Sequence, residues 1–250
     1  MKKYLNNKVL HAVLWILIYV VTVNIGEYLS EVLMFPYITS IAVLFLSIFL
    51  CVYIGKNRLQ LTYDLTDKPL MNSSLLIYIP LFIIGVIQLI KGFDESLDKG
   101  EILSITFLMI GVGLIEEVIF RGFLLNGIRE KCSIKKAIII SGVTFGVGHI
   151  VNLARGYGYN ELIAQILVAI VIGIILAMLV VSTKKLLPGI LFHIIFNITG
   201  SITIQNQVLD NYILITILFI AIPYGIYLFN RIKAKMGQFN TNNLMNTDNI

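Results

Sequence analysis

The chain has 250 residues, of which 58% are hydrophobic and only 13% are charged, and its formal net charge is +5. An ordinary soluble domain exposes more charge than this, so the composition excludes one and indicates a membrane protein with several spans. The basic residues stand in short stretches between apolar runs, where they orient membrane helices, so no nucleic-acid partner is expected.

Eight apolar runs are each about as long as the roughly twenty helical residues that cross a hydrocarbon core. They lie at 9–26, 33–55, 73–91, 102–126, 137–152, 160–182, 186–204 and 211–230. We therefore predict an all-α fold, a polytopic transmembrane helical bundle of about eight spans in the lipid bilayer. The fifth run is short and contains Gly142, Gly146 and Gly148, which predicts a tilted helix or close packing against its neighbours.

Basic residues are unequally divided between the two sets of loops and ends. One set holds 15 of them: Lys2, Lys3, Lys8, Lys56, Arg58, Lys68, Arg129, Lys131, Lys135, Lys136, Lys184, Lys185, Arg231, Lys233 and Lys235. The other set holds only Lys91, Lys99 and Arg155. Because cytoplasmic loops are rich in Lys and Arg, both termini are predicted to be cytoplasmic. Richness in Ile, Asn and Lys indicates a bacterial source, and hence a multi-pass protein of the cytoplasmic membrane.

The runs divide the chain into four parts. We predict three membrane helices in 1–99, a core of four helices in 100–204, a last membrane helix in 205–232 and a disordered cytoplasmic tail in 233–250. The tail is polar and poor in apolar residues, so it cannot bury a core. Cys51 and Cys132 form no CxxC pair, so neither a disulfide framework nor a cysteine metal site is expected.

Three charged residues interrupt the fourth apolar run, in the stretch "GLIEEVIFRG". An isolated charge at the centre of a membrane helix costs roughly 2.5–3.5 kcal/mol on insertion scales, so these residues need compensation. Glu117 and Arg121 are four apart and share a helix face, which predicts an internal ion pair. Glu116 is turned about 100° away and has no share in that pair. The spacing therefore predicts one structural carboxylate and one that is free to act chemically.

Two further runs bring polar groups to overlapping depths. Phe145 and His149 share a face in "FGVGH", and His193 and Asn197 share one in "HIIFN". At about 1.5 Å of rise per residue, Glu116, His149, His193 and Asn197 lie roughly 10–20 Å from the cytoplasmic ends of their helices. We expect these four to converge on one water-accessible cavity in the cytoplasmic half to middle of the membrane.

This set of side chains could support hydrolysis with or without a metal ion, and the residue types do not decide between these two mechanisms. A carboxylate with two histidines supplies a general base and electrophilic partners. Alternatively, Glu116, His149 and His193 could be three ligands of a zinc ion with an open position for water.

At these residues the chain resembles the CPBP (Abi) family of membrane proteins, because "EEVIFR", "FGVGH" and "HIIFN" match the family's EExxxR, FxxxH and HxxxN motifs in order. The resemblance covers about 100–200 and implies an intramembrane endopeptidase. It implies that Glu116 activates water, that Glu117 and Arg121 support it, and that His149, His193 and Asn197 bind metal or stabilise the oxyanion. The family is often labelled metalloprotease, and a metal-free mechanism is also proposed for it.

The leading hypothesis is therefore an endopeptidase that hydrolyses a peptide or membrane-anchored protein. The family also includes bacteriocin-immunity proteins, so a non-enzymatic immunity or partner-binding role is the alternative. Intramembrane Glu and His also suit a proton pathway, which makes a transporter a third hypothesis. Other protease templates are absent: the chain has no HExxH or GxSxG motif, and its aspartates all fall in predicted loops or the tail.

Overall fold

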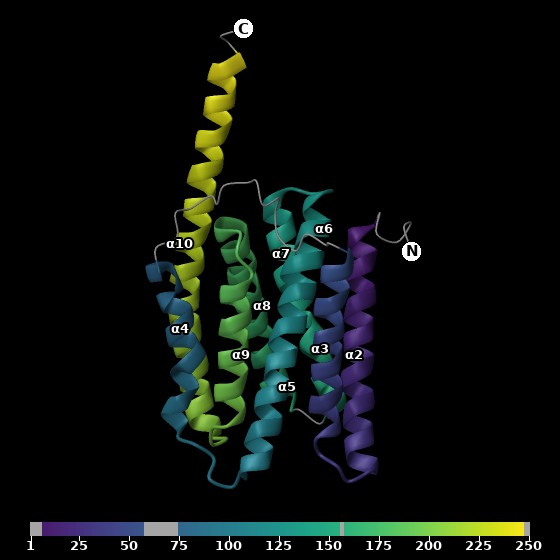
Figure 1. The fold of residues 1–250 in the computed structure, drawn as a ribbon. Helices are drawn as coiled ribbons and strands as arrows, with labels where there is room; N and C mark the ends of the chain where they lie inside the picture. Colours follow the sequence, from purple (N-terminus) through teal and green to yellow (C-terminus); the bar gives the residue numbers. More distant parts are fainter. Residues whose placement is uncertain (1–6, 58–74, 156–157, 248–250) are drawn as a thin grey trace.

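The computed structural model describes residues 7–57, 75–155 and 158–247, and these residues form helices with no strand among them. Figure 1 shows an elongated bundle in which both ends of the chain emerge at the same end. The elements in chain order are α2 (Lys8–Val32), α3 (Ile38–Asn57), η1 (Leu75–Tyr78), α4 (Ile79–Val86), η2 (Ile87–Lys91), α5 (Lys99–Glu117), η3 (Val118–Leu124), α6 (Leu125–Arg129), α7 (Ile134–Gly148), η4 (His149–Arg155), α8 (Tyr159–Thr183), α9 (Leu187–Ser201) and α10 (Gln207–Thr247).

The helices begin where the sequence supplies caps. Asp98 accepts a hydrogen bond from the Glu101 backbone while the Glu101 side chain accepts one from the Asp98 backbone, a capping box that starts α5. Ser133 caps α7 in the same position, and proline in the first turn of α9 occupies a place where no backbone donor is needed. Local signals therefore fix where α5, α7 and α9 start.

The described part of each of the eight predicted runs is mainly helical, which confirms the all-α fold class. Within the described residues, six helices are long and apolar enough to cross a membrane, while Leu75–Lys91 and Leu187–Ser201 are shorter. The chain is a multi-pass membrane protein by these helices. The count of eight spans, the cytoplasmic side of both termini and the four-part division of the chain stay predictions.

The last helix is longer than the sequence indicates. Its apolar part ends near Ala234, but α10 continues to Thr247 and projects from the bundle (Figure 1). The backbone is thus helical over much of 233–250, where we expected disorder. A helix of this length without tertiary packing is marginal in water, so disorder of the tail in solution stays a prediction.

Close packing of α7 on α8 confirms the role expected for Gly142 and Gly146 of the fifth run, whereas Gly148 makes no such approach. A Cβ placed on Gly146 would lie 2.6 Å from the backbone nitrogen of Ile170, and one on Gly142 would lie 2.6 Å from that of Ile174. Such contacts with backbone cannot be relieved by a side-chain rotation. Helices in membranes approach each other through small residues of this kind.

Gly146→Ala is expected to lower the melting temperature of the purified protein, because overpacking of this kind costs about 1–3 kcal/mol. Gly148→Ala is the matched control, since a Cβ there would meet nothing within 4 Å and the substitution lies on the same helix. Equal melting temperatures for the two variants would contradict the packing described here.

Candidate active site

The candidate site lies on a long continuous helix whose hydrogen-bond pattern changes from α to π at the charged motif. α5 ends at Glu117, a π-helical turn follows as η3, and α6 continues from Leu125. The backbone N–H of Leu125 donates to the Phe120 carbonyl in this wider turn, and the Ser141 hydroxyl donates to the same carbonyl at 2.8 Å. Such π turns often mark functional sites. The sequence contains no signal that predicts one here.

The predicted ion pair between Glu117 and Arg121 is present. Arg121 Nη1 donates to Glu117 Oε1 at 2.7 Å, and both side chains are fully buried. The guanidinium also lies 4.2 Å from the centre of the Phe145 ring, and Nη2 donates to the Gly173 carbonyl at 3.4 Å. These partners tie η3 to α7 and α8, so the pair supports the site's architecture.

His193 lies between the two adjacent glutamates. Its Nδ1 is 3.1 Å from Glu117 Oε1, and its Nε2 is 3.3 Å from Glu116 Oε2. The Nδ1 contact has hydrogen-bond geometry, whereas the Nε2 contact is a close approach, and Glu116 Oε2 has no hydrogen-bond partner among the described residues. The sequence predicted different partners for the two adjacent glutamates. In the structure both carboxylates lie against the same His193 ring of α9.

Glu116 is held by a partner that the sequence motifs do not contain. The Tyr19 hydroxyl, from α2, donates to Glu116 Oε1 at 2.8 Å. Together with His193 it orients the carboxylate at the edge of a cavity. Glu116 is therefore outside the Arg121 pair, as predicted, but it has ordered neighbours of its own.

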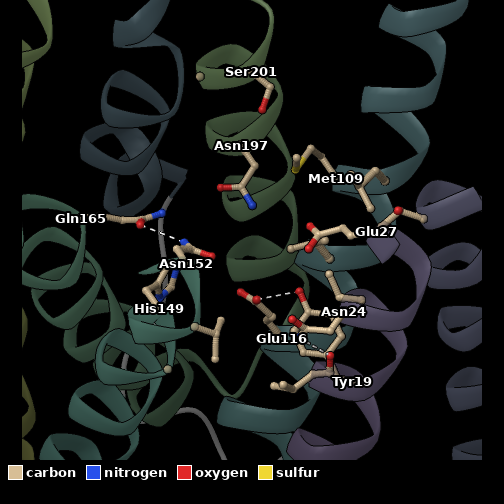
Figure 2. Close-up of a pocket in the computed structure, with 18 of the residues that line it drawn as sticks. Tyr19, Asn24, Glu27, Met109, Glu116, His149, Asn152, Gln165, Asn197 and Ser201 are labelled. Atoms are coloured by element: carbon tan, nitrogen blue, oxygen red, sulfur yellow. Dashed lines mark hydrogen bonds between the residues drawn. The ribbon is translucent and has the colours of Figure 1, made fainter. Parts of the chain in front are cut away.

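A cavity of about 1,010 Å³ brings three of the four expected residues together. Glu116, His149 and Asn197 line it, while His193 lies behind Glu116 and contacts its carboxylate. Figure 2 shows the labelled side chains arranged around this space, with α2 on one side and His149 on the other. The structure thus brings the motif residues together, and their catalytic roles stay predictions.

The Phe145 ring lies between His149 and His193 and contacts both. The Phe145 ring centre lies 5.2 Å from the centre of the His149 ring and 5.6 Å from that of His193, in both cases edge to face. His149 Nδ1 lies 3.2 Å from the Phe145 carbonyl oxygen. Since a carbonyl only accepts, Nδ1 is the donor and carries the proton.

The donor geometry does not fit a metal centre. Zinc would need Glu116, His149 and His193 to approach a common point at about 2.0–2.2 Å. Among the residues that the structure describes, no group of three or more His, Cys, Asp or Glu side chains is arranged to hold a metal ion. Both His193 nitrogens face carboxylates, and His149 Nδ1 is occupied by a carbonyl. The zinc alternative stays a prediction from the residue types.

Sequence reasoning missed the contribution of α2 and of the α7–α8 connection. Asn152 Nδ2 donates to Gln165 Oε1 at 2.9 Å, and both residues line the cavity. On α2 a signal was present, because polar residues recur at helical spacing, but the predicted run ended at 26 and so excluded the last turns. The lining residues on α2 are Ile16, Tyr19, Val20, Val23, Asn24, Glu27, Tyr28 and Glu31.

The cavity extends from the level of Glu116 toward one end of the bundle. Its lining runs from Glu116 to Ser201 and Gln205, next to the loop that joins α9 to α10. That loop is at the end of the bundle opposite the two termini (Figure 1). The expected position of the cavity, in the cytoplasmic half to middle of the membrane, stays a prediction, and the direction of its opening is a feature that the sequence did not predict. The motif depths alone could not show it, because they set a level in the membrane and not the direction of opening.

Comparison with known families bears on this geometry. Residues 98–199 match the model of a family described as Type II CAAX prenyl endopeptidase Rce1-like. This segment of the chain is therefore similar to that family. The matched segment runs from the cap of α5 to Thr199 in α9, so it contains the whole charged motif and the two histidines of the candidate site. No curated protein and no solved structure matched the chain.

The match confirms the resemblance to the CPBP family and supports a CAAX-type intramembrane protease. A peptide or protein substrate in the bilayer agrees with a protease family and a helical membrane bundle. The match does not favour the immunity alternative. Metal use and bacterial origin stay predictions.

Proposed function

We propose that this Rce1-like protein is an intramembrane endopeptidase in which Glu116 activates the attacking water. The observation that carries the proposal is the position of Glu116 at a polar cavity inside a membrane bundle, with its carboxylate oriented by Tyr19 and His193. Ionisable groups at this depth are costly and mark functional sites.

In the proposed reaction, Glu116 accepts a proton from a water molecule as its oxygen attacks the scissile carbonyl carbon. The Asn197 amide lines the cavity and donates a hydrogen bond to the developing oxyanion. When the carbon–nitrogen bond breaks, protonated Glu116 returns the proton to the leaving amine. One water is consumed, and a carboxylic acid and an amine are formed, which exchange a proton to give a carboxylate and an ammonium group.

The neighbouring residues keep Glu116 in position during these steps. The Tyr19 hydroxyl holds Glu116 Oε1. His193, which contacts the buried Glu117–Arg121 pair, lies 3.3 Å from the other Glu116 oxygen. His149 carries its proton on Nδ1, so in the neutral ring its Nε2 is an acceptor. We assign it the positioning of water or of the substrate N–H, and not oxyanion binding.

Chelators are expected to leave the activity of the purified protein in liposomes unchanged, because the proposed steps use side chains only and the donor geometry does not fit a metal. The measurement compares cleavage rates before and after treatment with EDTA and with 1,10-phenanthroline. Loss of activity that added zinc restores would contradict the metal-free mechanism while leaving peptide hydrolysis in place.

The proposal is tested by comparing the membrane peptides of cells that contain the wild-type protein with those of cells that contain Glu116→Gln. Specific fragments should be present only with the wild type, and their uncleaved parents should accumulate with the variant. Glu161→Gln is the matched control, because Glu161 is an exposed acid in the first turn of α8. Identical peptide sets for wild type and Glu116→Gln would contradict a protease function.

A further inference from the structure

The cavity has a polar wall that runs in one direction from Glu116. On α9, His193, Asn197 and Ser201 follow one another at four-residue spacing and so share one helix face. Of these, Asn197 and Ser201 line the cavity. Figure 2 shows them in sequence beyond Glu116, toward the end of α9.

The facing wall on α2 follows the same direction. Asn24, Glu27 and Glu31 line the cavity at helical spacing, and all three lie on the side of Tyr19 that leads to the end of α2 at Val32. Both polar walls therefore extend from Glu116 toward the loops 33–37 and 202–206. Polar groups at membrane depth must line protein or water rather than lipid, so this path is the route by which water reaches Glu116.

The opposite direction is closed by aromatic side chains in the described part of the chain. Trp15 and Phe123 are 4% and 6% exposed, and they pack with Tyr53 and His11. Ring centres of Trp15 and Tyr53 are 5.2 Å apart, and those of His11 and Phe123 are 4.6 Å apart. On α2 the cavity lining ends at Ile16, one residue after Trp15. This aromatic cluster (His11, Trp15, Tyr53 and Phe123) separates Glu116 from the end of the bundle that carries the termini.

Charge identifies the two ends of the bundle. Among the residues that the structure describes, the loops and helix ends on the side of the termini hold 11 of the basic residues counted above, whereas the loops at the open end of the cavity hold Lys91, Lys99 and Arg155. The first side is the one expected in the cytoplasm. The cavity consequently opens to the extracytoplasmic side.

From this geometry we infer that the substrate reaches Glu116 from the extracytoplasmic side. Resting on the proposed function, the inference specifies the substrate class as an extracytoplasmic peptide segment of an exported or membrane-anchored protein. A cytoplasmic C-terminal tail is excluded as the main substrate, because it would have to pass the aromatic cluster to reach the carboxylate.

Access is tested by single cysteines that react with a membrane-impermeant methanethiosulfonate reagent in right-side-out and in inverted membrane vesicles. In a Cys51→Ala, Cys132→Ser protein, Ser201→Cys and Gln205→Cys report the mouth of the cavity and Val20→Cys reports its depth beside Tyr19. Native Cys132, kept in Cys51→Ala, is the matched control, because it is exposed between α6 and α7 near the end that carries the termini.

The three cavity cysteines are expected to react at least tenfold faster in right-side-out vesicles, and Cys132 in inverted ones. Reaction of the cavity cysteines and Cys132 from the same side would overturn the inference. So would failure of all three to react in folded protein when Cys132 of the separate Cys51→Ala control is labelled. This readout needs no cleavage, so it is independent of the proposed function.

The substrate class is tested by mapping the fragments that depend on Glu116. Cleavage sites in extracytoplasmic segments beside a membrane span are expected. Cleavage sites in cytoplasmic C-terminal tails would overturn the inference but leave the protease function intact. The absence of any Glu116-dependent fragment would overturn the protease function, and the cysteine labelling would then decide the direction of access.

Discussion

Glu116→Gln is expected to lower the rate of peptide hydrolysis by about 10²–10⁴-fold, the usual contribution of a general acid or base. Glutamine keeps the size of the side chain and an oxygen that accepts from the Tyr19 hydroxyl, but it cannot take a proton from water. The melting temperature should stay close to that of the wild type. The measurement is the cleavage rate of a substrate identified from membrane peptides, with purified protein in liposomes.

Two further variants, Glu161→Gln and Glu116→Asp, show whether the loss of activity is specific to the Glu116 carboxylate. Glu161→Gln, an exposed acid on α8, should cleave at the wild-type rate. Glu116→Asp keeps a carboxylate but withdraws it from the cavity, so its rate should lie between those of wild type and Glu116→Gln. Wild-type turnover by Glu116→Gln would remove Glu116 from the chemistry, and an equal loss for all three variants would indicate a general defect in the protein.

Arg121→Ala is expected to lower the free energy of unfolding by about 3–5 kcal/mol, because it leaves the buried Glu117 carboxylate without its cation. Both side chains are fully buried, and Arg121 also lies against the Phe145 ring. Melting of the detergent-solubilised protein measures the loss. Arg231→Ala is the matched control, since Arg231 is exposed and donates to Tyr227 on the same helix, where such contacts contribute little.

A double variant separates the ion pair from simple loss of volume. Arg121→Met with Glu117→Gln removes both charges and retains most of the packing, so it should be more stable than the sum of the two single effects predicts. Additive losses would show that the pair is not coupled. A stable Arg121→Ala protein would contradict the burial of the pair itself.

The helices and the charged motifs could be predicted because membrane physics limits the choices. Hydrocarbon thickness sets the length of an apolar run, and the cost of charge in lipid singles out residues such as Glu116 and Arg121. Four-residue spacing then predicted the Glu117–Arg121 pair, which the structure confirms. Glycine spacing likewise predicted the close approach of Gly142 and Gly146 to α8.

The remaining features depend on packing between distant segments. Tyr19 reaches Glu116 from a helix 97 residues away in sequence, and nothing in the motif indicates that partner. No feature of the amino-acid composition predicts the π turn at Val118–Leu124. The direction in which the cavity opens depends on how α2 and α9 pack along their lengths. The depth estimates gave only the level of each side chain in the membrane. Tertiary arrangement decided all three.

Hydrolysis in heavy-oxygen water tests most directly whether a water activated by Glu116 cleaves a peptide bond in this cavity. Wild-type and Glu116→Gln protein, purified and reconstituted in liposomes, are incubated with solubilised membrane proteins in H₂¹⁸O. Fragments with one ¹⁸O atom in each new C-terminal carboxylate are expected for the wild type, and none of these fragments for Glu116→Gln. The same labelled fragments with both proteins, or with neither, would contradict hydrolysis by a Glu116-activated water.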